Sequence, residues 1–216
     1  MPVWPIETAW LGDDVFIIGG GYSLQKMKFD WTLLHDEHTI GCNDAYTRGE
    51  KVCKICFFGD MRWYKHHEDK LSRFSNPIFT NVSGLKRAKV SWLWTVKRYG
   101  TGLHSDGIGW NGNTGAAAIN LALLLGVRRI YLLGFDMQRV DDRANWHKDN
   151  IRPEATTPDI YKGFTKGFGR IVHDWKAKFS RVEIFNVTDC SALPSDVIPW
   201  LDPTEFWSMR KCQQSQ

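Results

Sequence analysis

Short apolar runs recur along the chain, and each one stops at glycine or at small polar residues. Residues 15–18 end at Gly19-Gly20-Gly21-Tyr22-Ser23, and residues 130–133 end at Gly134-Phe135-Asp136. Residues 39–42 end at Asn43-Asp44, and residues 53–58 end at Gly59-Asp60. Apolar runs of this length, bounded by turn residues, are typical of buried strands. Because the carboxyl ends of parallel strands lie along one edge of a sheet, the pattern predicts a shared ligand crevice there.

A second periodicity marks helices between these strands. Thr114 is suited to cap a helix, and Gly115 leaves room for a ligand at its first turn. Residues 116–125 are apolar all round except at Asn120, as in a buried helix that Gly126 ends. Residues 24–27 can begin a helical turn, and residues 60–71 form another expected helix. From Pro158 onward, apolar residues recur every three or four positions, at Ile160, Phe164, Phe168, Ile171, Val172, Trp175 and Phe179. This spacing predicts a long amphipathic helix.

The order of strands and helices predicts an α/β fold with a single Rossmann-like, doubly wound, mostly parallel sheet. Residues 78–80 and 181–187 are expected to add further strands. Residues 83–113 are polar and rich in glycine and aromatic residues, and the pattern assigns them no element. We expect residues 1–216 to form one nucleotide-binding domain, with residues 188–216 as an irregular C-terminal cover and tail.

Composition narrows the class of protein. The chain has 216 residues, of which 43% are hydrophobic and 24% charged, which is sufficient for one proper core. Its formal net charge of +4 favours anionic ligands but is far from a polybasic surface. Five cysteines, with no secretory signal and no stretch long enough to span a membrane, favour a reducing, cytoplasmic location. Cys53 and Cys56 are expected on opposite faces of one strand, as small buried residues and not as metal ligands.

At several of these motifs the chain resembles the small bacterial sialyltransferases that use a CMP-sugar donor. Related Rossmann-like proteins described as 6-hydroxymethylpterin diphosphokinase-like, and short phage proteins, are also similar. The resemblance spans roughly residues 14–190. It is carried by Gly19-Gly20-Gly21-Tyr22-Ser23-Leu24, Cys42-Asn43, residues 53–58, Asn113-Thr114-Gly115, residues 130–136, and His147 ahead of the last long helix. The family has an asparagine where Gly59 stands, and the tyrosines that bind its donor phosphate are replaced here by Gln138 and Arg139.

The resemblance implies a set of site residues. The nucleotide is expected to contact Gly19, Gly20, Gly21, Ser23, Asn43, Asp60, Asn113, Thr114, Gly115 and Gly134. Asp136 would organise the pocket floor, and His147 would be the general base, since an imidazole titrates near neutral pH. Arg139, Arg143 and Lys148 would neutralise the leaving phosphate in place of the tyrosines.

Plainer interpretations stay open for these residues. The glycines can form a structural turn between a strand and a helix, and Asn43-Asp44 can form an Asx turn. Asp136 can hold ribose hydroxyls, bind a divalent ion, or only cap a turn. A lone histidine such as His147 can be an ordinary surface residue, and a charged loop around Arg139 can simply be solvated.

The leading hypothesis is an inverting glycosyltransferase that passes a sugar from a nucleotide-sugar donor to a hydroxyl. The acceptor suggested by the phage resemblance is a modified base in DNA. No cofactor is required if the chain is sialyltransferase-like, although Mg²⁺ could assist. The alternatives are a pyrophosphokinase that uses ATP and Mg²⁺ on a hydroxymethyl heterocycle, and a non-catalytic nucleotide-binding module. A homo-oligomer is compatible with the sequence, and a membrane partner is not expected.

Overall fold

The structure is a computed structural model that describes residues 9–85, 90, 92–147 and 158–214. Its strands are β1 (Asp14–Ile18), β2 (His38–Cys42), β3 (Ile55–Phe58), β4 (Ile78–Thr80), β5 (Leu93–Thr95), β6 (Arg98–Tyr99), β7 (Ile108–Gly109), β8 (Arg129–Leu133) and β9 (Glu183–Asn186). Its helices are α1 (Ser23–Lys26), α2 (Met61–Leu71), α3 (Thr114–Leu124), α4 (Pro158–Lys178) and α5 (Pro203–Gln214), with 3₁₀ turns η1 (Trp31–Leu34) and η2 (Asn43–Arg48). None of these described helices combines the length and the apolar character that crossing a membrane requires.

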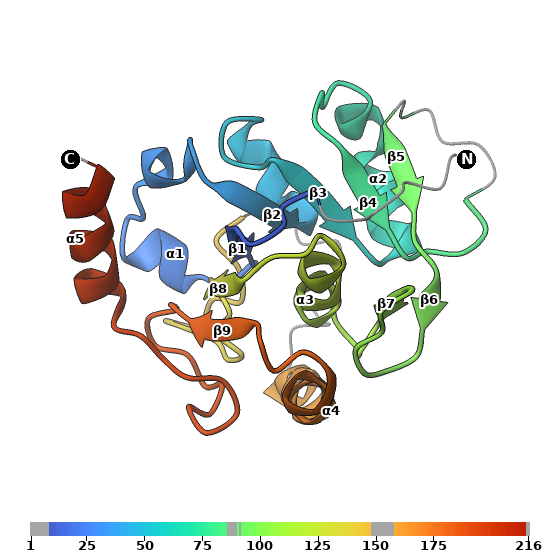
Figure 1. The fold of residues 1–216 in the computed structure, drawn as a ribbon. Coiled ribbons are helices and arrows are strands. Elements are labelled where there is room, and N and C mark those ends of the chain that lie inside the picture. The colour runs from blue at the N-terminus through green and yellow to red at the C-terminus, as the bar shows by residue number, and fades with distance from the viewer. Residues whose placement is uncertain (1–8, 86–89, 91, 148–157, 215–216) are drawn as a thin grey trace.

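Seven parallel strands form the main sheet, in the order β5-β4-β3-β2-β1-β8-β9 (Figure 1). The chain builds outward from β1 to β5 in one direction and then returns to place β8 and β9 on the other side of β1. The strand order therefore reverses between β1 and β8, which is where open α/β sheets bind ligands. The predicted doubly wound α/β fold is confirmed.

Alternate residues of the central strands face opposite layers of helices. Val15 and Ile17 of β1 belong to the same core cluster as the apolar residues of α3, whereas Phe16 and Ile18 pack with Leu24 of α1 and Trp207 of α5. Figure 1 shows α3 and α4 on one side of the sheet and α1 and α5 on the other. A sheet covered on both faces has strands that are apolar at every position, which explains the continuous runs in the sequence.

Two expectations about structure are wrong. The tail is not wholly irregular, because α5 forms and places Phe206 and Trp207 against Phe16 of β1, with ring centroids 6.2 and 5.3 Å apart. Cys53 lies outside β3, and it packs in the same core cluster as Cys56, not on the opposite face. Both thiols are fully buried, as expected of small core residues.

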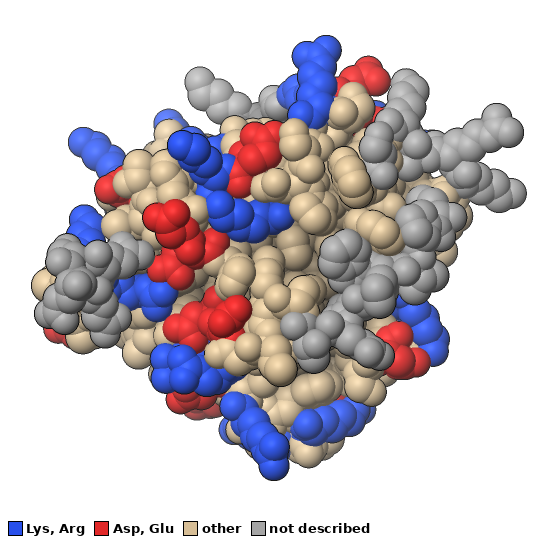
Figure 2. Space-filling model, turned by 45° about the horizontal axis from the view of Figure 1, so that its top comes forward, with Lys and Arg blue, Asp and Glu red and all other residues tan. Residues whose placement is uncertain are grey.

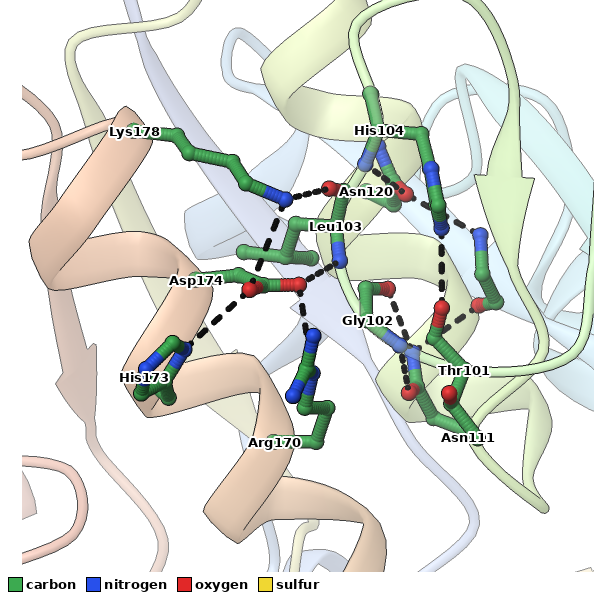
Figure 3. Close-up of polar contacts among 11 residues, drawn as sticks. Thr101, Gly102, Leu103, His104, Asn111, Asn120, Arg170, His173, Asp174 and Lys178 are labelled. Carbon is green, nitrogen blue, oxygen red and sulfur yellow. Dashed lines mark hydrogen bonds and ion pairs between the residues drawn. The ribbon is translucent and has the colours of Figure 1, made fainter.

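The segment left unassigned in the sequence contains β5, the two short strands β6 and β7, and a loop fixed to α3 and α4 by buried polar bonds (Figure 3). The Asp174 carboxylate of α4 accepts the Leu103 N–H at 2.9 Å, and the Asn120 side chain of α3 bonds both the N–H and the carbonyl of His104. Asn111 bonds both backbone groups of Gly102. These bonds fix the path of the chain that leads to Trp110 and Asn113.

Candidate functional site

A cleft of about 430 Å³ lies at the carboxyl ends of β1, β2, β3 and β8, where the strand order reverses. The predicted residues that line it are Gly19, Gly20, Gly21, Asn43, Asp60, Asn113, Thr114, Gly115, Gly134, Asp136 and His147. A cleft of this volume is in the ordinary range for small-molecule and cofactor sites. The structure therefore brings together predicted residues that are up to 128 positions apart in the sequence, from Gly19 to His147.

The glycine turn after β1 contains two glycines that close packing requires and one that borders the cleft. A Cβ on Gly19 would lie 2.6 Å from the Gly134 carbonyl oxygen, and a Cβ on Gly21 would overlap Oδ1 of Asp136. These two glycines are required because β1 and β8 end so close together. Gly20 differs, since its hydrogens face the cleft near Asn145 and His147. Of the three, Gly20 is the position best placed for a ligand to approach the backbone.

Ser23 lies beneath the cleft and not on its wall. Its hydroxyl donates to Asp136 Oδ1 at 2.5 Å, and its N–H donates to Asp136 Oδ2 at 2.9 Å, so the carboxylate holds the start of α1. The nucleotide contact expected of the Ser23 hydroxyl is therefore replaced by a contact with Asp136. Burial raises the pKa of the Asp136 carboxyl from the ordinary 3.8 to about 6, although the Ser23 bonds oppose the shift.

This shift predicts how stability depends on pH. Because the pKa of Asp136 is higher in the folded state, the folded protein takes up a proton as the pH falls through 6, and the resulting gain in stability is nearly complete below about pH 3.5. The asparagine in Asp136→Asn has the same shape as the aspartate and can still hydrogen-bond Ser23, but it has no charge that burial would destabilise. We expect the variant to be more stable than the wild type at about pH 7.5, by about 1–3 kcal/mol, and the difference to vanish nearly completely by about pH 3.5. Urea unfolding at a series of pH values measures this, and a difference independent of pH would contradict it.

Two side-chain amides present unused polar atoms at the cleft. Asn113 uses its Oδ1 to accept the Ala116 N–H at 2.7 Å, whereas its Nδ2 is buried with no hydrogen-bond partner among the described residues. Asn43, in a left-handed backbone conformation with φ of 51°, likewise has a buried Oδ1 with no partner in the described part of the chain. Leaving buried polar atoms unpaired costs about 1–3 kcal/mol each. Because both residues line the cleft, this donor and this acceptor are candidates to bind a ligand there.

The N-terminus of α3 also points into the cleft, since Asn113, Thr114 and Gly115 all line it. The cap is Asn113 and not Thr114 as expected, because the side chain that accepts the first-turn N–H is that of Asn113. The absence of a side chain at Gly115 has a packing reason, since a Cβ there would lie 2.8 Å from the Phe135 ring. Free N–H groups and the dipole at such a helix end favour a phosphate.

His147 lies at the rim of the cleft, with a side chain that is 15% exposed. The segment before it is fixed by Trp146, whose backbone N–H bonds the Gly20 carbonyl at 3.0 Å and whose indole N–H bonds the Gly19 carbonyl at 2.9 Å. The His147 Nε2 atom lies 3.8 Å from Oδ2 of Asp44. The imidazole is therefore held beside the glycine turn and close to a carboxylate.

The predicted cations do not gather in the cleft. Arg139 lines an adjoining cavity of about 670 Å³ with Lys162 and Lys166, and this cavity shares Met137, Gln138 and Tyr161 with the cleft. Arg143 instead stacks on the Tyr22 ring, 5.0 Å from its centroid. Lys148 lies outside the described residues. Their assignment to a leaving phosphate rested on proximity in the sequence, and neither of the two described arginines lines the cleft, although Arg143 lies against Tyr22 of the glycine turn.

Several residues at the cleft were not predicted from the sequence. Arg62, Trp63 and Tyr161 line it, and His67 lies behind it. Arg62 lies in the first turn of α2, which Asp60 caps by accepting the Arg62 N–H at 2.7 Å. Tyr161 projects from the first turns of α4, and burial raises the pKa of its hydroxyl, with Arg139 opposing the shift. The periodicity of α2 could have indicated His67, because it shares a buried face with Trp63 and Leu71.

The cleft carboxylates already have protein partners. Asp44 accepts the Trp63 indole N–H, Asp60 caps α2, and Asp136 accepts two bonds from Ser23. Within the described residues, no group of three or more histidine, cysteine or acidic side chains is arranged to hold a metal ion. The described residues around the cleft therefore do not fit a dedicated Mg²⁺ site.

No protein-family model matches the chain, and no curated protein matches it. Among solved structures, the sialyltransferase CstII from Campylobacter jejuni in complex with cytidine-5'-monophosphate is similar, with 14% identity and a TM-score of 0.49 over 88% of this chain and 85% of that one. CstII in complex with CMP-3FNeuAc gives 13% identity and a TM-score of 0.46 over 87% and 86% of the two chains. A CST-II variant in complex with CMP has 14% identity and a TM-score of 0.48, over 87% of this chain and 86% of that one.

Proposed function

We propose that the chain is an inverting glycosyltransferase that binds a nucleotide-sugar donor in this cleft. The observation that carries the proposal is the convergence of two unpaired amide atoms with the N-terminus of α3. The Asn43 Oδ1 acceptor and the Asn113 Nδ2 donor suit the polar edge of a base or a ribose. The first turn of α3 suits the phosphate.

The chemistry is inferred from His147, which lines the same cleft as the first turn of α3. An acceptor hydroxyl oxygen attacks the anomeric carbon of the donor from the face opposite the phosphate, while the bond from that carbon to the phosphate oxygen breaks. The leaving nucleotide keeps the electron pair, and His147 Nε2 takes the hydroxyl proton. The adjoining cavity, which shares Tyr161 and Gln138 with the cleft, gives an acceptor a route to this position.

The pyrophosphokinase alternative requires divalent ions held by carboxylates. Among the described residues, each of the three cleft carboxylates already accepts a protein hydrogen bond, from Trp63, Arg62 or Ser23, and no group of three acidic side chains is arranged to hold a metal ion. A DNA acceptor would require a basic surface. On the face drawn in Figure 2, lysine and arginine side chains are interspersed with acidic ones and do not form one continuous patch. We therefore favour sugar transfer, and DNA remains an acceptor to be tested and not part of the central proposal.

A nucleotide panel tests the proposal. We expect CMP, CDP or UDP to raise the melting temperature in a dose-dependent way without Mg²⁺, because the contacts proposed are amide and backbone groups. A rise that occurs only with ATP and Mg²⁺ would support the pyrophosphokinase instead. Binding without any release of nucleotide from CMP- or UDP-sugars would support the non-catalytic module.

A further inference from the structure

Asp44 is a buried carboxylate at the cleft that the proposed chemistry has not yet used. It is only 3% exposed, and it lies in η2, directly after the end of β2. A buried acidic side chain is costly unless its charge is compensated. Its neighbours therefore indicate what it does.

Two residues of α2 fix the orientation of this carboxylate. The Trp63 indole N–H donates to Asp44 Oδ2 at 2.9 Å, and His67 Nε2 lies 3.5 Å from Oδ1. His67 is fully buried and stacks on Trp63 with ring centroids 4.3 Å apart. Its Nδ1 lies 2.8 Å from the Tyr46 hydroxyl, so the ring cannot turn without losing that contact.

The Asp44 oxygen that accepts the Trp63 N–H, Oδ2, is also the one near His147. The distance of 3.8 Å from Asp44 Oδ2 to His147 Nε2 is too long for a direct hydrogen bond. It does allow one oxygen atom to lie about 2.8 Å from both atoms, as a substrate hydroxyl would. The Cys56 thiol of β3 also lies near Asp44. It is neutral because burial raises its pKa.

We infer that Asp44 is the electrostatic partner of His147, with Trp63 and His67 as the positioning residues that aim the carboxylate at the imidazole. This inference rests on the proposed function, which makes His147 the base. When His147 takes the proton of the acceptor hydroxyl, it becomes a cation, and the carboxylate 3.8 Å away stabilises that cation. The same carboxylate helps to orient the hydroxyl before attack.

Titration of His147 by NMR tests the pairing without any substrate. In histidine-labelled full-length protein, the His147 imidazole signal is assigned by its loss in His147→Gln. We expect its pKa to lie above the ordinary value of about 6.5 and to fall by about one unit or more in Asp44→Asn, because an opposite charge this close favours the protonated ring. The amide oxygen introduced by Asp44→Asn could still accept the Trp63 N–H, so the fold should persist. Asp60→Asn, which removes an exposed carboxylate from the same cleft, is the matched control and should leave the titration nearly unchanged.

The outcomes separate this inference from the proposed function. A His147 pKa that is unchanged in Asp44→Asn would overturn the pairing, even if the nucleotide panel shows binding. If Asp44→Asn does not fold, the wild-type titration decides, and a His147 pKa at or below about 6.5 would overturn the inference. Failure of every nucleotide to bind would remove the donor but would not alter the titration.

Discussion

Replacing His147 with alanine is expected to lower turnover by about two orders of magnitude or more, the usual effect of removing a general base. Turnover is measured as release of CMP from CMP-sialic acid in the presence of hydroxyl compounds, or from whichever donor the nucleotide panel selects. The affinity for the nucleotide itself should change little, since the proposed nucleotide contacts come from Asn43, Asn113 and the first turn of α3.

The matched control for this prediction is His173→Ala, which removes an exposed histidine of α4, 69% exposed at its side chain, and should keep full activity. Turnover at the wild-type rate in His147→Ala would remove His147 from the mechanism. Loss of nucleotide binding together with turnover would instead indicate that the imidazole binds the donor and does not act on the acceptor.

Replacing Gly21 with alanine is expected to cost about 3 kcal/mol or more of folding stability. The new Cβ would overlap Asp136 Oδ1 and lie 2.5 Å from the Gly134 carbonyl oxygen, and neither a buried carboxylate nor a strand backbone can move aside cheaply. Displacing Asp136 would also leave the Ser23 N–H unpaired in a buried position, which adds about 1–3 kcal/mol. Urea unfolding measures the loss, and a variant as stable as the wild type would contradict the packing described for the glycine turn.

The neighbouring Gly20 provides the comparison within the same turn. A Cβ on Gly20 would approach only side-chain atoms, with Asn145 Oδ1 nearest at 3.0 Å. We therefore expect Gly20→Ala to lose much less stability than Gly21→Ala, but to bind nucleotide more weakly because its methyl group occupies the cleft. Gly169→Ala, on an exposed interior position of α4 with open space around it, should leave nucleotide binding unchanged and raise stability by about 0.5–1 kcal/mol, because alanine is the better helix former.

The features predicted correctly from the sequence are those set by local patterns. The apolar runs at 15–18 and 130–133 identify central strands because a strand covered on both faces is apolar at successive positions. The sequence also identifies α3 as a buried helix, because its own residues are apolar on nearly every side. Since parallel strands end at a common edge of the sheet, the polar residues that follow them lie close together.

What the sequence could not reveal depends on packing between distant segments. Whether the Ser23 hydroxyl faces a ligand or Asp136 depends on a residue 113 positions away. His66 and His67 look alike in the sequence, and the docking of α2 is what exposes the first and buries the second against Asp44. The α5 helix was missed because two aromatic residues, Phe206 and Trp207, provide most of its buried contacts.

Calorimetric titration of CMP into the wild-type protein and into Gly20→Ala tests most directly whether the strand ends form one donor site. We expect a single site per chain in the wild type, without Mg²⁺, and clearly weaker binding in Gly20→Ala, with the fold of the variant intact. The absence of CMP binding, or equal affinity in both proteins, would contradict the assignment of this cleft to the donor.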